Sequence, residues 1–159
     1  KSTYEGLIFP DDPSFANPSS MTTAIRDYCS RTRQSAPETP ADYCRCIVRS
    51  LALRYRQVVE ILEGMCSFPI RKLHVIGGGS QNRYLMQYAA NALNLPVICG
   101  PVEGTALGNV LLQLKASGAV DSLTQMGEIS AASVDLVTYF PENAESWNIE
   151  YERYKTTTL

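Results

Sequence analysis

The spacing of apolar and polar residues predicts a long amphipathic helix in the first half of the chain. From residue 40 to residue 64 the apolar residues recur at intervals of three and four, which places them on one helix face. Thr39 is the predicted N-cap and Pro40 the first helical residue. The predicted buried stripe consists of Cys44, Ile47, Val48, Leu51, Tyr55, Val58, Val59 and Leu62. The arginines between them are expected on the solvated face.

Shorter elements are predicted on either side of this helix. Residues 1–19 contain three prolines and are expected to be irregular surface chain. Ser19 or Ser20 is expected to cap a helix that carries Met21, Ile25, Tyr28 and Cys29 on one face. Further along, the pattern predicts a short helix over 122–130, extended chain over 134–140 and a final helix over 142–154. The last helix carries an aromatic stripe, which we expect to dock on the core: Trp147, Tyr151 and Tyr154.

Between these regions lie two strand–turn–helix units in tandem. Apolar runs at 73–76 and 96–99 are each followed by a glycine-containing turn and then by a helical pattern. Two successive strands joined through a helix run parallel, with a right-handed crossover. Continuous apolar strands are typical of sheets covered by helices on both faces. We therefore predict an α/β fold with two parallel strands and expect further strands beside them, although residues 1–66 contain none of comparable strength.

The first turn holds three glycines in succession and is the candidate binding site. Without a Cβ, Gly77, Gly78 and Gly79 let the backbone lie against another molecule or adopt positive φ. Backbone amides at such a strand-to-helix turn bind phosphate or ribose oxygens, which predicts a nucleotide site. The alternative interpretation is that the glycines serve only a tight turn and close helix packing.

The known nucleotide motifs match this turn incompletely. A G-x-x-x-x-G-K-[ST] loop is absent, and the dinucleotide pattern G-x-G-x-x-G has Asn82 in place of its third glycine. Glu103 follows the second strand and could take the place of the ribose-binding acid. A dinucleotide-dependent oxidoreductase therefore remains an alternative hypothesis, as does a non-catalytic interaction domain.

Composition limits the choice of partners. The 159 residues are 45% hydrophobic with a net charge of −2, which indicates one globular domain and argues against broad binding to nucleic acid. No apolar run approaches the roughly 18 residues of a membrane span, so no membrane partner is expected. The chain starts at Lys1, with no cleavable signal, and we expect it to be processed, trimmed or part of something longer.

Cysteine and histidine usage predicts no metal site. The five cysteines form no C-x-x-C pair, and His74 is the single histidine, so the usual four-ligand zinc arrangement is absent. We expect the thiols to be buried and reduced, as in the cytoplasm. A disulfide from Cys29 to Cys44 or Cys46 is the alternative. His74 is expected to be packed or at a sheet edge.

Several motifs together resemble a known family. The segment 75–82, the run Tyr84-Leu85-Met86-Gln87, Pro96-Val97 and the segment 100–109 closely resemble the carboxy-terminal domain of FGGY-type carbohydrate kinases. The resemblance extends over essentially the whole chain. Segments 9–15, 37–40 and 49–56, together with Met21, Ala24-Ile25 and Tyr28-Cys29, are similar to the rhamnulokinase branch of that family.

The resemblance implies a fold and an activity. Residues 1–159 would form the carboxy-terminal portion of a ribonuclease-H-like (actin-like ATPase) domain, with the amino-terminal sugar-binding domain absent. The implied activity is ATP-dependent phosphorylation of the 1-hydroxyl of L-rhamnulose, with Mg²⁺ bridging the phosphates, in the cytoplasm. Kinases of other ketoses or polyols (L-fuculose, xylulose or glycerol) remain alternatives.

The resemblance also implies roles for individual residues. Gly77, Gly78 and Gly79 would lie along the adenosine or phosphate groups, Ser80 would be the N-cap of the following helix, and Asn82 would contact the adenine or ribose edge. Glu103 and Thr105 would shape the second turn, while Ala106 and Gly108 would let its helix lie close to the sheet.

The catalytic groups implied by the family are not found in this chain. Such kinases carry a D-x-G-[ST] phosphate loop and a later catalytic aspartate, and none of the six aspartates here has either context. We therefore expect no catalytic residue in this chain and no activity from it alone. We also expect it to self-associate, through an exposed sheet edge or through helix faces such as the aromatic stripe.

Overall fold

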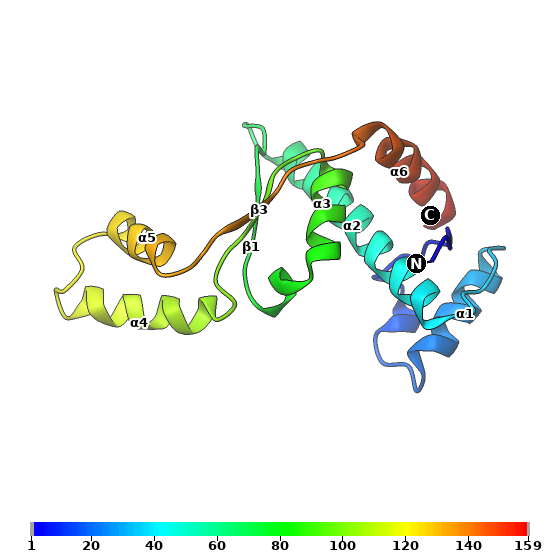
Figure 1. The fold of residues 1–159 in the computed structure, drawn as a ribbon, viewed down its shortest axis with the longest axis horizontal. Coiled ribbons are helices and arrows are strands. Elements are labelled where there is room, and N and C mark those ends of the chain that lie inside the picture. Colours follow the sequence, from blue (N-terminus) through cyan, green and yellow to red (C-terminus); the bar gives the residue numbers. More distant parts are fainter. Residues whose placement is uncertain (1, 159) are drawn as a thin grey trace.

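The computed structural model describes residues 2–158 as a helical body, a small sheet and a projecting helical arm (Figure 1). The body contains α1 (Met21–Arg31), α2 (Pro40–Met65), α3 (Arg83–Leu93) and α6 (Ala144–Thr158); the arm contains α4 (Gly104–Ala116) and α5 (Leu123–Ala132). The strands are β1 (Leu73–Val75), β2 (Val97–Cys99) and β3 (Val137–Tyr139), and 3₁₀ turns cover Pro13–Phe15 and Gly78–Gln81. Figure 1 shows the arm on one side of the sheet and the body helices on the other.

The sheet contains the two predicted parallel strands and one more. Its order is β1-β2-β3, with Leu73 opposite Val97 in the parallel pair, which confirms the prediction. The third strand lies within the predicted extended segment 134–140 and pairs antiparallel with β2, with Tyr139 opposite Val97. Antiparallel pairing of β3 could not be inferred from the right-handed crossover rule, because β3 follows the arm rather than a single crossover helix.

Only one face of this sheet is covered by the described helices. Helix α3 contacts β2 and β3 on the covered face, whereas His74 and Thr138 on the opposite face are exposed. The predicted second layer of helices is therefore not formed by residues 2–158, because α4 and α5 project away from the sheet (Figure 1). His74 lies on the edge strand β1, and a sheet edge was one of the two positions expected for it.

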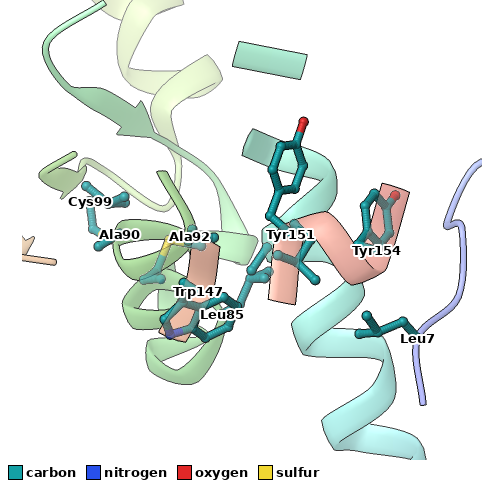
Figure 2. Close-up of a cluster of buried hydrophobic side chains, with 13 residues drawn as sticks. Leu7, Leu85, Ala90, Ala92, Cys99, Trp147, Tyr151 and Tyr154 are labelled. Atoms are coloured by element: carbon teal, nitrogen blue, oxygen red, sulfur yellow. The ribbon is translucent and has the colours of Figure 1, made fainter. Parts of the chain in front are cut away.

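The core lies where α2, α3 and α6 meet. Helix α3 packs against α2, and its alanines and the fully buried Met86 belong to the same buried cluster as Ala52 and Leu53 of α2. From α6, Trp147 packs against Tyr88 with ring centroids 5.1 Å apart. Tyr151 stacks on Tyr154 with centroids 6.4 Å apart, and Figure 2 shows both rings beside Trp147 in the core cluster. The predicted docking of the aromatic stripe is thus confirmed. Its proposed use in self-association is wrong, because Tyr151 and Tyr154 are 2% and 0% exposed.

Helix α2 begins as predicted, but its buried face is shifted. Thr39 accepts a hydrogen bond from the Asp42 amide and Asp42 caps in return, which makes a capping box. The residues buried along α2 are Cys46, Arg49, Ser50, Ala52, Leu53 and Val59. Cys44, Val58 and Leu62, which the apolar stripe placed in the core, are exposed. The shift arises because the amino-terminal segment contacts the side of α2 that carries Arg49 and Ser50, whereas Val58 and Leu62 border an open groove beside β1.

The amino-terminal segment is ordered by side chains rather than by secondary structure. The Leu7 amide donates to Gln34 Oε1 at 2.8 Å, and Gln34 Nε2 donates to the Leu7 carbonyl at 2.7 Å. The Ile8 amide donates to Ser50 Oγ at 2.9 Å. Leu7 is fully buried, so the prediction that residues 1–19 are surface chain is wrong for this part. Buried backbone groups need partners, and two polar side chains supply them here.

All five cysteines are free thiols. Cys29 and Cys46 are buried in a second apolar cluster with Ile25 and Tyr28, whereas Cys44 is exposed. The expectation of free thiols is confirmed and the alternative disulfide is not formed, but the expected burial is wrong for Cys44 and Cys66, which are exposed. Burial raises the pKa of the Cys46 thiol to about 12, which keeps it protonated. No helix of residues 2–158 is long and apolar enough to cross a membrane.

Candidate functional site

The two glycine turns lie side by side at one end of the sheet. Because β1 and β2 are parallel, their carboxyl ends meet at the same edge, where α/β proteins bind ligands. The Gly77 amide donates to the Pro101 carbonyl at 3.0 Å, and the Gly100 amide donates to the Val75 carbonyl at 2.8 Å. These two hydrogen bonds hold the turns in register.

In the first turn, Gly77 is required by the backbone itself. Its φ is +87°, a value that residues with a Cβ rarely adopt. The Ser80 amide and hydroxyl both donate to the Gly77 carbonyl, at 3.0 and 2.7 Å, and the Asn82 amide donates to Gly79 at 3.1 Å. The turn therefore has one defined conformation before any ligand arrives.

Gly78 and Gly79 differ from Gly77, because nothing in the chain requires them to be glycine. Both are exposed, neither has a positive φ, and a Cβ built at either would meet no atom within 4 Å. The structural interpretation of the glycines, a tight turn or close packing, thus applies to Gly77 alone. The open space over Gly78 and Gly79 is what a closely approaching ligand needs.

The cap of α3 is Asn82 rather than Ser80. Asn82 Oδ1 accepts a hydrogen bond from the Leu85 amide at 3.1 Å, whereas the buried Ser80 hydroxyl is held by Gly77. The predicted N-cap role of Ser80 is wrong because Ser80 lies within a 3₁₀ turn that ends before the helix begins. The side-chain oxygen of Asn82 is therefore occupied by the cap, and its side-chain NH₂ group is free to donate to a ligand.

Arg83 is a residue of this site that the sequence analysis missed. It is the first residue of α3 and is exposed, with its guanidinium 5.8 Å from the centre of the Tyr84 ring. A cation at a helix N-terminus opposes the helix dipole, so it is unfavourable without a nearby anion. The signal that could have identified it is this charge directly after a helix cap.

The second turn is shaped by glycines around one side chain. A Cβ at Gly100 would lie 3.0 Å from Ile76 Cγ2, and one at Gly104 would lie 3.2 Å from Ile76 Cδ1. Glu103 occupies the N-cap position of α4 without a side-chain capping bond, and both Glu103 and Thr105 are exposed. The close packing of Ile76 against these glycines, rather than the two polar side chains, determines the shape of the turn.

The helix that follows does not lie on the sheet. Ala106 is exposed, and a Cβ at Gly108 would meet nothing within 4 Å. The expectation that these small residues permit close packing on the sheet is therefore wrong for residues 2–158. The first residue of α4, Gly104, lies close to Ile76, the residue that follows β1.

Comparison with known proteins places this geometry in a family. Residues 3–117 match the FGGY family of carbohydrate kinases, C-terminal domain. The chain is 46% identical over 152 residues to a rhamnulokinase of Bacteroides thetaiotaomicron and 43% identical over 152 residues to one of Pectobacterium atrosepticum. Each match covers 96% of this chain and 31% of the relative, so the chain spans less than a third of the length of these proteins.

Solved structures show the same fold. A xylulose kinase from Rhodospirillum rubrum superposes with a TM-score of 0.59 and 23% identity, covering 77% of this chain and 25% of the other. A gluconate kinase from Lactobacillus acidophilus superposes with a TM-score of 0.60 and 14% identity, covering 92% and 36%. The α/β fold expected for this domain is thus confirmed, and the chain belongs to the FGGY family of carbohydrate kinases, within their carboxy-terminal domain.

Proposed function

We propose that residues 1–159 are the nucleotide-binding, carboxy-terminal portion of a longer ATP-dependent sugar kinase whose acceptor is the 1-hydroxyl of L-rhamnulose. The acceptor is supported by relatives named rhamnulokinase that are 34–46% identical to this chain. The observation that carries the nucleotide site is the uncovered backbone of Gly78 and Gly79, beside the N-terminus of α3. Family membership disfavours the oxidoreductase and interaction-domain alternatives.

The chain's own residues would bind and orient the nucleotide. Gly77 fixes the turn, and the bare backbone at Gly78 and Gly79 receives the adenosine or a phosphate at van der Waals distance. The amide group of Asn82 would donate to the adenine or ribose edge, and Arg83 would attract phosphate oxygens. Glu103 and Thr105, exposed in the adjacent turn, border the same space.

Magnesium would enter on the nucleotide rather than on this chain. Residues 2–158 contain no group of three His, Cys, Asp or Glu side chains able to hold a metal ion. When bound to the phosphates, Mg²⁺ neutralises the charge that develops during phosphoryl transfer. The residues that fit this arrangement are Arg83 and the turn amides, which would hold the phosphates.

The chemical step would need groups from elsewhere in the longer protein. Within this chain Asp11 pairs with Arg54, Asp12 pairs with Arg31, and Asp42 caps α2, so these carboxylates have structural roles. We propose that the phosphate loop, the catalytic aspartate and most sugar contacts lie outside residues 1–159. The isolated chain would then be inactive. We also propose a cytoplasmic location, which the five free thiols support.

The substitution Gly78→Val tests the nucleotide site. It fills the open space over the turn without straining the backbone, so ATP affinity should fall at least tenfold, about 1.4 kcal/mol, while the fold is kept. Gly127→Val in α5 is the matched control, because a Cβ there also meets nothing within 4 Å. Calorimetric titration with ATP and with NAD gives the readout. Unchanged ATP affinity in folded Gly78→Val, or preference for NAD, would overturn the proposal.

A further inference from the structure

A basic groove lies on the body, at the carboxyl ends of α1 and α6 (Figure 1). Its volume is about 570 Å³, and its lining consists of three arginines, three threonines and Gln34. The arginines are Arg31 and Arg33 at the end of α1 and Arg153 in α6. No acidic side chain of residues 2–158 lines the groove with them. This arginine groove therefore gathers positive charge and includes no residue of the glycine turns.

Ion pairs reduce this positive charge only in part. Arg31 pairs with Asp12 at 2.9 Å, and Arg153 pairs at 2.9 Å with Glu150, which Arg153 shares with the buried Arg49. Arg33 forms no ion pair with a carboxylate of residues 2–158. A guanidinium carries five N–H donors, so all three arginines keep donors that no described group uses. Like charges that are close together repel one another, which favours a bound anion.

Arg33 occupies a backbone position that does not suit arginine. Its φ is +58°, in the left-handed region that favours glycine just after a helix. The other non-glycine residues with positive φ among residues 2–158 are asparagines, whose short side chains tolerate this region. A charge that complements the helix dipole is already present in the last turn of α1, as Arg31. Neither the backbone nor the helix end therefore calls for a second arginine at position 33.

The loop that carries Arg33 is held by hydrogen bonds. Gln34 is tied to the backbone of Leu7 by bonds of 2.8 and 2.7 Å, and its Nε2 also donates to Thr32 Oγ1 at 2.8 Å. Three amides after α1 donate to three of its last carbonyls: Thr32 to Tyr28, Arg33 to Ser30 and Gln34 to Cys29. Unpaired carbonyls at a helix end would repel an anion, and these are paired. The groove thus presents its guanidinium groups on a fixed frame.

We propose that the arginine groove binds a small anion that carries phosphate groups. Guanidinium groups pair with phosphate oxygens through two parallel hydrogen bonds, and arginine is favoured over lysine where such pairing matters. A volume of about 570 Å³ lies within the usual range for small-molecule sites. The inference goes beyond the proposed function and does not rest on it. Two sources share this chemistry: a free inorganic phosphate, and a sugar phosphate of the class that a sugar kinase makes.

Calorimetric titration of the chain with pyrophosphate at low ionic strength tests the groove. Arg33→Gly removes one guanidinium and supplies the residue that the backbone favours, so the variant should be at least as stable as the unmodified chain. We expect it to weaken pyrophosphate binding at least tenfold. Arg33→Lys keeps the charge without the planar fork and should weaken binding by less. The matched control is Arg71→Gly, which removes the same charge at an exposed position outside the groove and should leave binding unchanged.

The melting temperature is a second readout. A ligand that binds the folded state raises it, so pyrophosphate should stabilise the unmodified chain and Arg71→Gly far more than Arg33→Gly. L-rhamnulose 1-phosphate, titrated in parallel, separates the two sources of phosphate. Tighter binding than that of pyrophosphate would identify a sugar phosphate as the ligand, and weaker binding would identify an inorganic phosphate.

Several results would overturn the proposal. One is pyrophosphate affinity that is absent from the unmodified chain or unchanged in folded Arg33→Gly. Another is equal weakening in Arg33→Gly and Arg71→Gly, which would show attraction to net charge alone. Tighter binding of hexaglutamate than of either phosphate would identify an acidic protein segment as the partner. Loss of pyrophosphate binding in Gly78→Val would place the anion at the glycine turn instead, whereas failure of ATP to bind there would leave the arginine groove standing.

Discussion

Helices α3 and α4 each follow a glycine turn at the end of a parallel strand, yet α3 is largely buried and α4 is largely exposed. In α3, six of eleven residues are buried: Leu85, Met86, Ala89, Ala90, Asn91 and Ala92. In α4, Leu111 is the single buried residue of thirteen. The difference is one of partners, since α3 packs between α2 and the sheet, whereas α4 contacts chiefly α5 (Figure 1).

The patterns of the two helices explain part of this difference. Helix α3 has one apolar face of large and small residues that fits α2. Helix α4 carries Val110, Leu111, Leu112 and Leu114 in near succession, so its apolar side chains point in several directions. Apart from the face that carries Thr105, Asn109 and Gln113, the surface of α4 is thus largely apolar, and such a wide apolar surface is typical of a helix that packs against a partner. The comparison teaches that the body contains most of the buried apolar side chains of residues 2–158, while the arm leaves much of its apolar surface exposed.

The largest expected effect is on the free energy of unfolding, which should depend on apolar side chains of the body far more than on those of the arm. Met86→Ala should lower the free energy of unfolding by about 2–5 kcal/mol, because it opens a cavity in the buried cluster to which α2, α3 and α6 contribute. Leu112→Ala in α4, at a side chain that is 56% exposed, should change it by no more than about 0.5 kcal/mol. Urea unfolding followed by circular dichroism measures both. Equal effects would show that the arm is packed in solution.

A second prediction concerns the buried charge in the body. The Arg49 side chain is 6% exposed, pairs with Glu150 and donates to the Tyr4 carbonyl at 3.0 Å. Desolvation lowers the pKa of its guanidinium. Glu150→Ala would leave this charge without its carboxylate and should cost about 1.5–3 kcal/mol.

The control for that substitution lies on the same helix. Glu152 pairs with Lys155 on the surface, where the carboxylate is 69% exposed. Glu152→Ala should cost less than about 1 kcal/mol, because solvent screens exposed ion pairs. Chemical denaturation in parallel measures both variants. If the two costs are the same, the Arg49–Glu150 pair is as solvated as the surface pair.

The arm yields a third prediction, on self-association. Its exposed apolar side chains include Leu112 and Leu123, which is 71% exposed. We propose that the isolated chain associates through them, and Leu112→Glu should weaken this association roughly tenfold, or about 1.4 kcal/mol. Light scattering over a wide concentration range measures it, with Gln113→Glu as a control that adds the same charge one position away. A chain that stays monomeric at every concentration would contradict the proposal.

The smallest effect is a pH dependence at the start of α2. Hydrogen bonds from Ser2 and from Thr39 lower the pKa of the Asp42 carboxyl to about 2. A depressed carboxyl pKa contributes stability above its unfolded value near pH 3.8, and that contribution disappears as the pH falls toward 2. The melting temperature should therefore fall less between pH 5 and roughly pH 2 in Asp42→Asn than in the unmodified chain. Identical pH profiles of the two proteins would show that the Asp42 carboxylate does not stabilise the start of α2.

Much of the local structure could be predicted because it depends on neighbours in sequence. Thr39 and Pro40 start α2 as expected, since a cap needs only the next three residues. The parallel pairing of β1 and β2 followed from the helix between them. The three glycines marked the turn that the structure leaves open. The role of Ser80 was wrong because the local pattern does not distinguish a 3₁₀ turn from the first turn of a helix.

The sequence by itself determined the type, order and approximate limits of most helices and strands, and that two glycine turns meet at one end of a parallel pair, because these properties depend on spacing and backbone conformation. The tertiary structure alone decided which apolar residues are buried. It placed Arg49 and Leu7 inside and left Val58 and Leu62 open. The physical reason is that burial is a property of pairs of surfaces: a helix face is buried only where a partner covers it, and periodicity does not specify that partner.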